Sequence, residues 1–149
     1  LPNPPRDNRE FNTQTGLANI ITHKLQPIVT EERQFVMMSI RSHDQYNTTI
    51  YSTSDRYRGI SGGRRVVMMN RDDLKTRGWN EFQKVSITSH HDGRTISSEG
   101  WTIIEYDIPA GNVATYFPES NVLIPLDSVA DSSNTPTSKS VVVTIDTMN

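Results

Sequence analysis

Residues 34–41 read Gln-Phe-Val-Met-Met-Ser-Ile-Arg, a nearly continuous apolar run that an arginine ends abruptly. A short run of this kind is typical of a strand that is buried on both faces. Residues 66–69, Val-Val-Met-Met, repeat the pattern, and residues 141–145, Val-Val-Val-Thr-Ile, repeat it near the end of the chain. These three runs predict the buried strands of the fold.

Between these runs, alternating apolar and polar residues predict a hairpin. One strand should begin near Val85, and Asp92-Gly93 is a preferred sequence for a tight hairpin turn. The return strand should be long and should extend to Ile108, with Gly100 marking a bulge or bend. A further strand is expected over residues 113–117.

Two short helices are also expected. Asn70 is a typical N-cap residue and Gly78 a typical C-terminal glycine, so residues 71–77 should be helical. Apolar residues between positions 17 and 25 recur at helical spacing until Pro27 stops the pattern. Strand signals nevertheless outnumber helical ones and come at irregular intervals, with long polar loops between them. The sequence therefore predicts a mainly β barrel with one or two short helices.

The composition fits one globular domain. A chain of 149 residues can bury a hydrophobic core, while an apolar fraction of 34% and a mean hydropathy of −0.57 indicate many turns and short strands. Residues 1–30 are expected to form a linker and residues 31–149 the barrel domain, because three of the first five residues are prolines. This start is typical of a piece cut from a longer polypeptide, and a processed precursor would look the same.

Charge and residue usage exclude several classes of function. A net charge of −2 and a pI of about 6.1 provide no broad basic surface for nucleic acid, so a phosphate ligand would have to be bound locally. Because the chain has no cysteine, it contributes no disulfide, zinc-thiolate or iron–sulfur ligand. No apolar stretch approaches the ~20 residues that span a bilayer, so we expect a soluble, cytoplasmic protein without direct membrane insertion.

Two polar loops are the candidate binding regions. The first, residues 42–49, directly follows the strand that ends at Arg41, and the second covers residues 118–139. Both are rich in amides and hydroxyls, which together with backbone N–H groups suit a nucleotide-like ligand. Arg41 and His43 suit phosphate oxygens, and Asn121 can bind a purine edge as both donor and acceptor. The alternative is that these side chains only form turns with the nearby backbone.

Other polar clusters have simpler interpretations. His90-His91 abuts the hairpin turn, so alternation along the strand would point the two rings to opposite faces rather than to one metal ion. The acid pairs Glu31-Glu32 and Asp72-Asp73 fit a linker and a helix cap better than a catalytic pair. The arginine pairs at positions 56/58 and 64/65 either face partner domains or are solvated. No nucleophile-elbow, glycine-rich phosphate-binding or zinc motif is present.

Motifs spread over nearly the whole chain point to one family. The first loop reads Arg-Ser-His-Asp-Gln-Tyr-Asn-Thr-Thr over residues 41–49, and Asp-Arg-Tyr-Arg-Gly follows at 55–59. The second loop begins within Tyr-Phe-Pro-Glu at 116–119, contains Asn-Thr-Pro at 134–136 and ends within Ser-Lys-Ser at 138–140. In this combination the chain resembles the C-terminal domain of the formate dehydrogenase and dimethyl sulfoxide reductase family of molybdopterin oxidoreductases, most closely its formate-dehydrogenase-alpha-like branch.

This resemblance implies a double-psi β-barrel that covers the cofactor-bearing domains of a larger catalytic subunit. In that family the loops hold a bis-(molybdopterin guanine dinucleotide) cofactor with molybdenum or tungsten, whereas the metal ligand and any iron–sulfur cluster lie in other domains. The cofactor and the remaining domains of the subunit are therefore the expected partners, and the isolated chain should have no turnover. The expected cofactor contacts are Arg41, Ser42, His43, Gln45, Tyr46, Asn47, Thr48, Asn121, Leu123, Thr135, Ser138 and Lys139.

The sequence departs from the family pattern at two places outside these loops. Leu17 stands where the family often has lysine, and Asn-Glu-Phe at residues 80–82 replaces a Gly-Asp turn. Two rival functions also stay open. One is a free β-barrel module that uses the same loops to bind a protein or peptide, since a barrel fold alone does not dictate function. The other, with less support, is a small independent enzyme.

Overall fold

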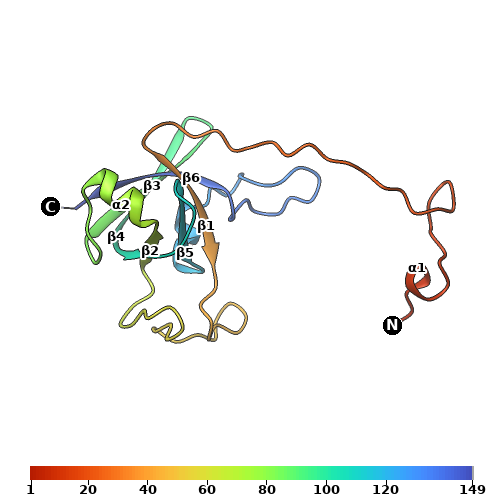
Figure 1. Cartoon of the computed structure of the whole chain (residues 1–149), viewed down its shortest axis with the longest axis horizontal. Helices are drawn as coiled ribbons and strands as arrows, with labels where there is room; N and C mark the ends of the chain where they lie inside the picture. Colours follow the sequence, from red (N-terminus) through yellow and green to blue (C-terminus); the bar gives the residue numbers. More distant parts are fainter. Residues whose placement is uncertain (149) are drawn as a thin grey trace.

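Six strands close into a barrel in the computed structural model, which describes residues 1–148 (Figure 1). The elements in chain order are α1 (Pro4–Asp7), β1 (Gln34–Ile40), β2 (Val66–Met69), α2 (Arg71–Arg77), β3 (Lys84–His91), β4 (Arg94–Glu105), β5 (Asn112–Tyr116), the 3-10 helix η1 (Glu119–Leu123) and β6 (Val141–Thr147). The predicted mainly β barrel with short helices is confirmed. Within the described residues, no helix is long and apolar enough to cross a membrane.

The barrel is a mixed sheet with the strand order β1-β5-β2-β4-β3-β6. β1 runs parallel to β5 and β2 parallel to β4, and the other neighbouring pairs are antiparallel. Parallel neighbours require long crossover connections, which the polar loops and α2 supply here. In the pair β1/β5, Ile40 lies beside Tyr116. Both strands therefore end at the same edge of the barrel, and the first loop projects from that edge (Figure 1).

The hairpin between β3 and β4 is confirmed, as is its bulge. Asp92 and Gly93 have positive φ angles of 47° and 73°, which suits a tight hairpin turn. The register between the two strands shifts just after Val85, opposite Gly100, whose φ is 80°. Because a positive φ is easy for glycine, this residue accommodates the extra position in β4. The strand ends at Glu105, somewhat earlier than predicted.

The helix α2 has the predicted ends. The Asn70 side chain accepts a hydrogen bond from the backbone N–H of Asp72 at 2.7 Å, which caps the first turn. Gly78 adopts a left-handed conformation with φ of 67° and closes the last turn. Leu74 is the buried residue of this helix and packs into the core, so α2 covers one end of the barrel.

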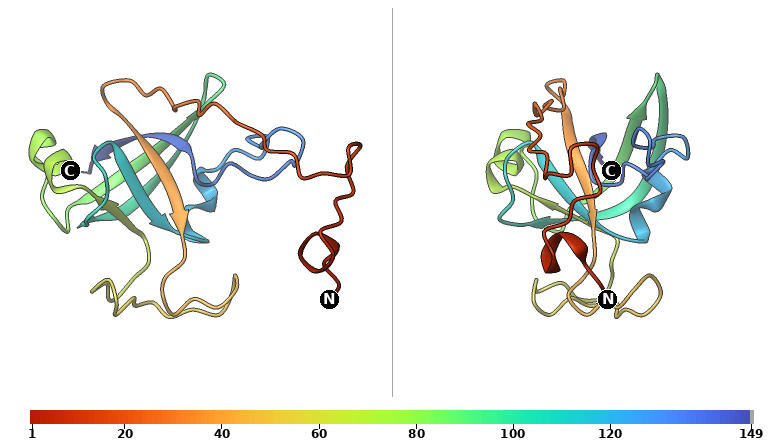
Figure 2. Two further views of the ribbon diagram at one scale, coloured as in Figure 1. Left: turned by 45° about the vertical axis from the view of Figure 1, so that its right-hand side comes forward. Right: turned by 90° about the vertical axis from the view of Figure 1, so that its right-hand side faces the viewer.

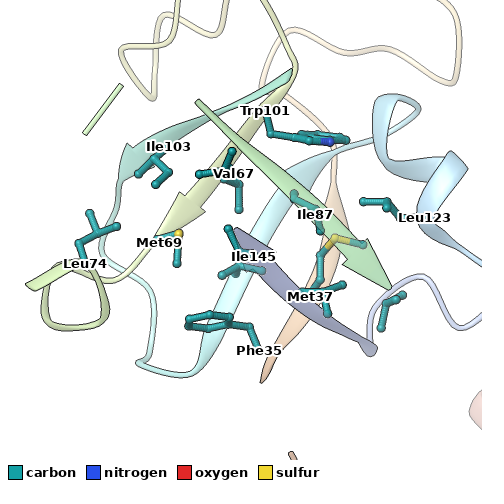
Figure 3. Close-up of a cluster of buried hydrophobic side chains, with 14 residues drawn as sticks. Phe35, Met37, Val67, Met69, Leu74, Ile87, Trp101, Ile103, Leu123 and Ile145 are labelled. Carbon is teal, nitrogen blue, oxygen red and sulfur yellow. The ribbon is translucent and has the colours of Figure 1, made fainter. Parts of the chain in front are cut away.

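The hydrophobic core fills the barrel with side chains from every strand (Figure 3). Trp101, Met37 and Ile87 are among its largest fully buried members. Each buried side chain of this size contributes roughly 1.5–3 kcal/mol, so the interior of the barrel dominates its stability. A second apolar cluster around Ile60 and Met68 covers the outside of β2, which explains why that strand is buried on both faces.

The prediction that β1 is buried on both faces is wrong. Phe35, Met37 and Ser39 point into the barrel, but Val36 is half-buried and Met38 is 37% exposed. The outward side of β1 therefore lies at the surface, unlike that of β2. The apolar run alone did not distinguish these two situations, because both strands present continuous hydrophobic residues.

The prediction of a helix between residues 17 and 25 is also wrong. This stretch has no regular structure, and Ile20 and Leu25 are 97% and 96% exposed. Figure 2 shows residues 1–30 running away from the barrel as an extended arm. A short helix gains most of its stability from packing an apolar face, and the arm has no surface to pack on. The second short helix is instead α1, where Asn3 caps the first turn.

Candidate functional site

Two adjoining hollows lie where the end of β1, the end of β5 and the second polar loop meet. Their volumes are about 360 and 160 Å³, and Phe117 and Ser138 line both of them. We refer to the two together as the loop hollow. Its lining residues are Ser39, Ile40, Arg41, Phe117, Asn121, Ile124, Pro125, Leu126, Thr135, Pro136, Ser138 and Lys139. The predicted cofactor contacts among them are Arg41, Asn121, Thr135, Ser138 and Lys139.

The ends of parallel strands bring these residues together. Arg41 follows β1, and Phe117 follows β5 and donates its backbone N–H to the carbonyl of Ile40 at 2.8 Å. Ser138 joins them because its carbonyl accepts a hydrogen bond from the N–H of Ser39 at 2.8 Å. Segments that lie far apart in the sequence are therefore held at one edge of the barrel by backbone hydrogen bonds.

The loop hollow carries two cations that its own side chains do not neutralise. Neither Arg41 nor Lys139 forms an ion pair with an acidic side chain of residues 1–148. The Lys139 ammonium donates to the backbone carbonyl of Ser39, which places its charge beside the smaller hollow. Guanidinium and ammonium groups bind anionic oxygens strongly, so this arrangement suits a phosphate-containing ligand.

The second polar loop is held in shape by contacts within it and with the β3–β4 hairpin. Val129 and Pro136 form an isolated β-bridge, and the Ala130 N–H donates to the carbonyl of Thr135 at 2.8 Å. Asp127 forms an ion pair with Arg94 at the tip of the β3–β4 hairpin. The Arg94 guanidinium holds the pKa of the Asp127 carboxyl below its ordinary value. The hairpin thus supports the loop that carries Thr135 and its neighbours.

Ser42 and Gln45 lie inside the first loop rather than on its surface. Both side chains are buried, and both bind Arg64: its guanidinium donates to Ser42 Oγ at 2.7 Å and to Gln45 Oε1 at 2.9 Å. Gln45 also donates to the carbonyl of Phe117 at 3.0 Å. The expectation that Arg64 is solvated or faces a partner domain is wrong, because its side chain is 4% exposed. The side chains of Ser42 and Gln45 thus organise the loop.

Asp55 is the centre of a second buried hydrogen-bond network, which holds the first loop at His43. Asp55 is 1% exposed and accepts hydrogen bonds from the Tyr116 hydroxyl at 2.8 Å and from Arg58 Nη1 at 2.6 Å. It also accepts one from the backbone N–H of His43 at 3.2 Å. Burial raises the pKa of Asp55, but these hydrogen bonds outweigh it and lower the pKa to about 2. Burial also raises the pKa of Tyr116, with a further contribution from Asp55.

The other predicted residues of the first loop form its outer surface. His43, Tyr46, Asn47 and Thr48 are exposed, and none of them lines the loop hollow. Asn47 has a positive φ of 58°, a conformation that asparagine tolerates better than most residues. These side chains are therefore accessible to a ligand or to another part of the protein.

Leu123 occupies a different environment from the other predicted contacts. Its side chain is 0% exposed and belongs to the hydrophobic core. The side chain therefore faces the interior of the barrel and not the loop hollow, and its predicted cofactor contact finds no support in this position. The residue shapes the site indirectly, because it fixes the end of η1 close to Asn121.

The remaining polar features lie elsewhere. A hollow of about 430 Å³ outside β2 is lined by residues 59–66 and by Lys84, and it contains no predicted cofactor contact. His90 Nε2 lies 2.9 Å from Thr144 Oγ1, whereas His91 Nε2 lies 3.5 Å from Asp92, so the two rings have different partners. Within residues 1–148, no group of three or more His, Asp or Glu side chains is arranged to hold a metal ion. The loop hollow is therefore the candidate site.

Comparison with protein-family models identifies a similar family. Residues 35–142 match the model described as "Molydopterin dinucleotide binding domain". The match includes both polar loops and every residue that lines the loop hollow.

Two kinds of curated protein are similar to the chain. An uncharacterized oxidoreductase of Mycobacterium tuberculosis (strain H37Rv) is 46% identical over 151 residues, which is 98% of this chain and 19% of that protein. The protein YdeP of Escherichia coli K12 is 36% identical over 147 residues, or 95% of this chain and 19% of that protein. The chain thus spans 19% of the length of these relatives.

A solved structure shares the fold. Acetylene hydratase from Pelobacter acetylenicus superposes with a TM-score of 0.52 at 9% sequence identity, over 78% of this chain and 19% of that chain. At this identity the likeness concerns the fold. It agrees with the mixed barrel described above.

Proposed function

Because this chain belongs to the molybdopterin dinucleotide binding domain family, we propose that it is the C-terminal domain of a molybdopterin oxidoreductase catalytic subunit and that it binds the guanine dinucleotide form of the cofactor. The relatives are about five times as long as this chain, which supports the remaining domains of the same subunit as its partners. The isolated chain is then a binding domain without turnover.

The observation that carries this proposal is the convergence of side chains on the loop hollow. Arg41 and Lys139 supply two cations without acidic partners among the described residues, and Asn121 supplies an amide at the larger hollow. A dinucleotide offers phosphate oxygens to the cations and a purine or pterin edge to the amide. Apolar side chains such as Phe117 and Ile124 provide surface against which a flat ring system can pack.

The residues present therefore fit the cofactor, and their roles follow from their chemistry. Arg41 and Lys139 would bind phosphate oxygens, and Asn121, Thr135 and Ser138 would hold the heterocyclic portions. His43, Tyr46, Asn47 and Thr48 would contact the cofactor from the outer surface of the first loop. The cofactor, when bound, supplies the redox chemistry. The chain itself binds and orients it and excludes water from one side.

Finer assignments are part of the same proposal. The two parallel pairs β1/β5 and β2/β4 in a six-stranded barrel support the double-psi type. The motif at residues 41–49 supports the formate-dehydrogenase-like branch and a bis-cofactor with molybdenum or tungsten. Any iron–sulfur cluster would lie in other domains, since the chain has no cysteine. A cytoplasmic location of the subunit completes the proposal.

The test is a titration of the isotopically labelled chain with GDP and with extracted molybdopterin cofactor, followed by amide NMR. We expect saturable shifts at residues 41–49, 117–123 and 135–139. In a second experiment, the full-length subunit is purified with its cofactor and probed by cross-linking. If neither experiment detects contact at these residues while the chain remains folded, the proposal is wrong.

A further inference from the structure

Arg64 is a buried arginine whose whole guanidinium is engaged in hydrogen bonds. Its guanidinium is 4% exposed and donates to Ser42 Oγ at 2.7 Å, Gln45 Oε1 at 2.9 Å, the Phe117 carbonyl at 2.8 Å and Glu119 Oε1 at 2.8 Å. Every guanidinium nitrogen takes part in at least one of these bonds. The planar fork of five donors in arginine makes such a set possible, whereas lysine has a single nitrogen.

Two aromatic rings lie within cation–π distance of the guanidinium. Its central carbon lies 4.1 Å from the ring centroid of Tyr51 and 4.8 Å from that of Tyr116. Tyr116 is fully buried at the end of β5, whereas Tyr51 follows the first loop and is 39% exposed. Cation–π contacts strengthen when water is excluded, so this stacking favours one orientation of the guanidinium.

The partners of Arg64 belong to two separate segments of the candidate site, which we call its two walls. The first wall is residues 41–49, and the second is residues 117–123. Ser42 and Gln45 lie in the first loop, immediately after Arg41. Phe117 lines both parts of the loop hollow, and Glu119 begins η1, which carries Asn121. One side chain therefore bonds the segment that positions Arg41 and the segment that positions Asn121.

We infer that Arg64 is a positioning residue that couples the two loops, so that a change at one wall of the loop hollow is transmitted to the other. This inference rests on the proposed function for its biological meaning, since the coupled walls are those of the cofactor site. Arg64 does not line the loop hollow and touches no ligand there. A cofactor that binds one wall would meet the second wall already in place, and the two ends of the dinucleotide would bind cooperatively.

The coupling can be tested without a ligand. Glu119→Gln weakens the bond between Arg64 and η1, so the amide resonances of Ser42 and Gln45 in the other loop should shift. In an Arg64→Met background the same substitution should shift those two resonances much less, since only the direct bond between Gln45 and the Phe117 carbonyl would remain. Equal shifts in both backgrounds would overturn the inference, because the perturbation would then travel by another route.

A second variant keeps the test decisive if Arg64→Met does not give a dispersed, folded spectrum. Arg64→Lys preserves the positive charge but replaces five donors on a planar fork with three donors on one nitrogen, too few for the four bonds of Arg64. The shift that Glu119→Gln transmits to Gln45 should then fall to less than about half of its size in the wild-type chain. A shift of undiminished size would contradict the role of Arg64.

A second experiment tests the functional consequence and measures the affinity of the whole 149-residue chain for GDP. Arg64→Lys should weaken binding by about tenfold, because the segments that carry Arg41 and Asn121 would no longer be held in place together. Arg65→Lys is the matched control at the next residue and should change the affinity less than about twofold, because Arg65 bonds Ser98 away from the site. Equal effects of the two variants would overturn the inference.

The two proposals fail in different ways. If GDP does not bind the wild-type chain or the subunit, the proposed function fails, and the ligand-free comparison still decides whether Arg64 couples the loops. If GDP binds but Glu119→Gln leaves the first loop unchanged, the coupling fails alone.

Discussion

Asp55 shows how a buried carboxylate remains ionised in this protein. Removal from water raises its pKa, yet the hydroxyl of Tyr116, the guanidinium of Arg58 and a backbone N–H lower it to about 2. The folded state therefore holds the charged form more strongly than the unfolded chain does, whose carboxyl has a pKa near 3.9. Protonation of Asp55 would leave Arg58 without its buried counter-charge and would loosen the first loop.

This difference makes a pH-dependent contribution to stability. For a carboxyl whose folded pKa is depressed, the contribution is fully present above the unfolded pKa and is lost as the pH falls toward 2. We expect the free energy of unfolding of the wild-type chain to drop by on the order of 2 kcal/mol between pH 5 and pH 2 relative to Asp55→Asn. Urea unfolding across this range measures it, with the exposed Asp131→Asn as control. Parallel pH profiles of wild type and Asp55→Asn would contradict the assignment.

Arg41 and Lys139 carry the second prediction at the scale of single residues. Because each presents a cation to the loop hollow, Arg41→Gln and Lys139→Gln should each lower the affinity for GDP by roughly tenfold, the effect of one lost charged hydrogen bond. Calorimetric titration measures the affinity. Arg71→Gln is the control, since Arg71 pairs with Glu105 and lies outside the loop hollow. Unchanged affinity in both site variants would remove the phosphate-binding role.

At the scale of elements, the site depends on where strands end. β1 and β5 run in parallel and finish side by side, so the residues that follow them, Arg41 and Phe117, meet at one edge of the barrel. The return of the chain at Ser138 pairs with the same edge. The direction of the strands therefore brings together binding residues that lie far apart in the sequence.

The cap of α2 provides a test at this scale. Asn70 accepts from the Asp72 N–H and donates to the Ile108 carbonyl at 2.6 Å, so one side chain stabilises the helix and ties it to the segment after β4. Asn70→Ala should destabilise the chain by about 1–2 kcal/mol in urea unfolding. Lys75→Ala on the exposed face of the same helix should cost less than about 0.5 kcal/mol. Similar effects of both variants would show that the cap contributes nothing.

At the scale of the whole molecule, the barrel and the arm differ in how much apolar surface they bury. The core lies within the barrel, while residues 1–30 extend from it and leave apolar side chains such as Ile20 exposed (Figure 2). We therefore predict that residues 31–149 form an independent folding unit. Deletion of residues 1–30 should change the free energy of unfolding by less than about 0.5 kcal/mol. Loss of a single cooperative transition in urea would contradict this division of the chain.

The exposed arm also illustrates a limit of pattern-based prediction. Apolar residues at helical spacing between positions 17 and 25 are necessary for an amphipathic helix but not sufficient, because the helix needs a surface against which to pack. By contrast, the ends of α2 depend on Asn70 and Gly78, whose local chemistry acts without distant partners. The hairpin at Asp92-Gly93 follows the same rule.

The sequence by itself determined the mainly β character, the helix α2, the hairpin with its bulge at Gly100, and the family. These features depend on residues that are close together in the chain or on motifs that occur in a characteristic order. The sequence also singled out Arg41, Asn121, Thr135, Ser138 and Lys139, through the resemblance of the two loops to the family and the polar chemistry of their side chains.

Only the tertiary structure decided that these residues converge on one hollow, that Leu123 is part of the core, and that Ser42 and Gln45 face inward. The reason is that their partners are distant in sequence: Arg64 lies 22 positions from Ser42 and 55 from Glu119, yet it bonds both. An arginine gains such a role only when barrel closure removes it from water and surrounds it with acceptors. No local pattern contains that information, so the residue that links the two loops became visible only in the folded chain.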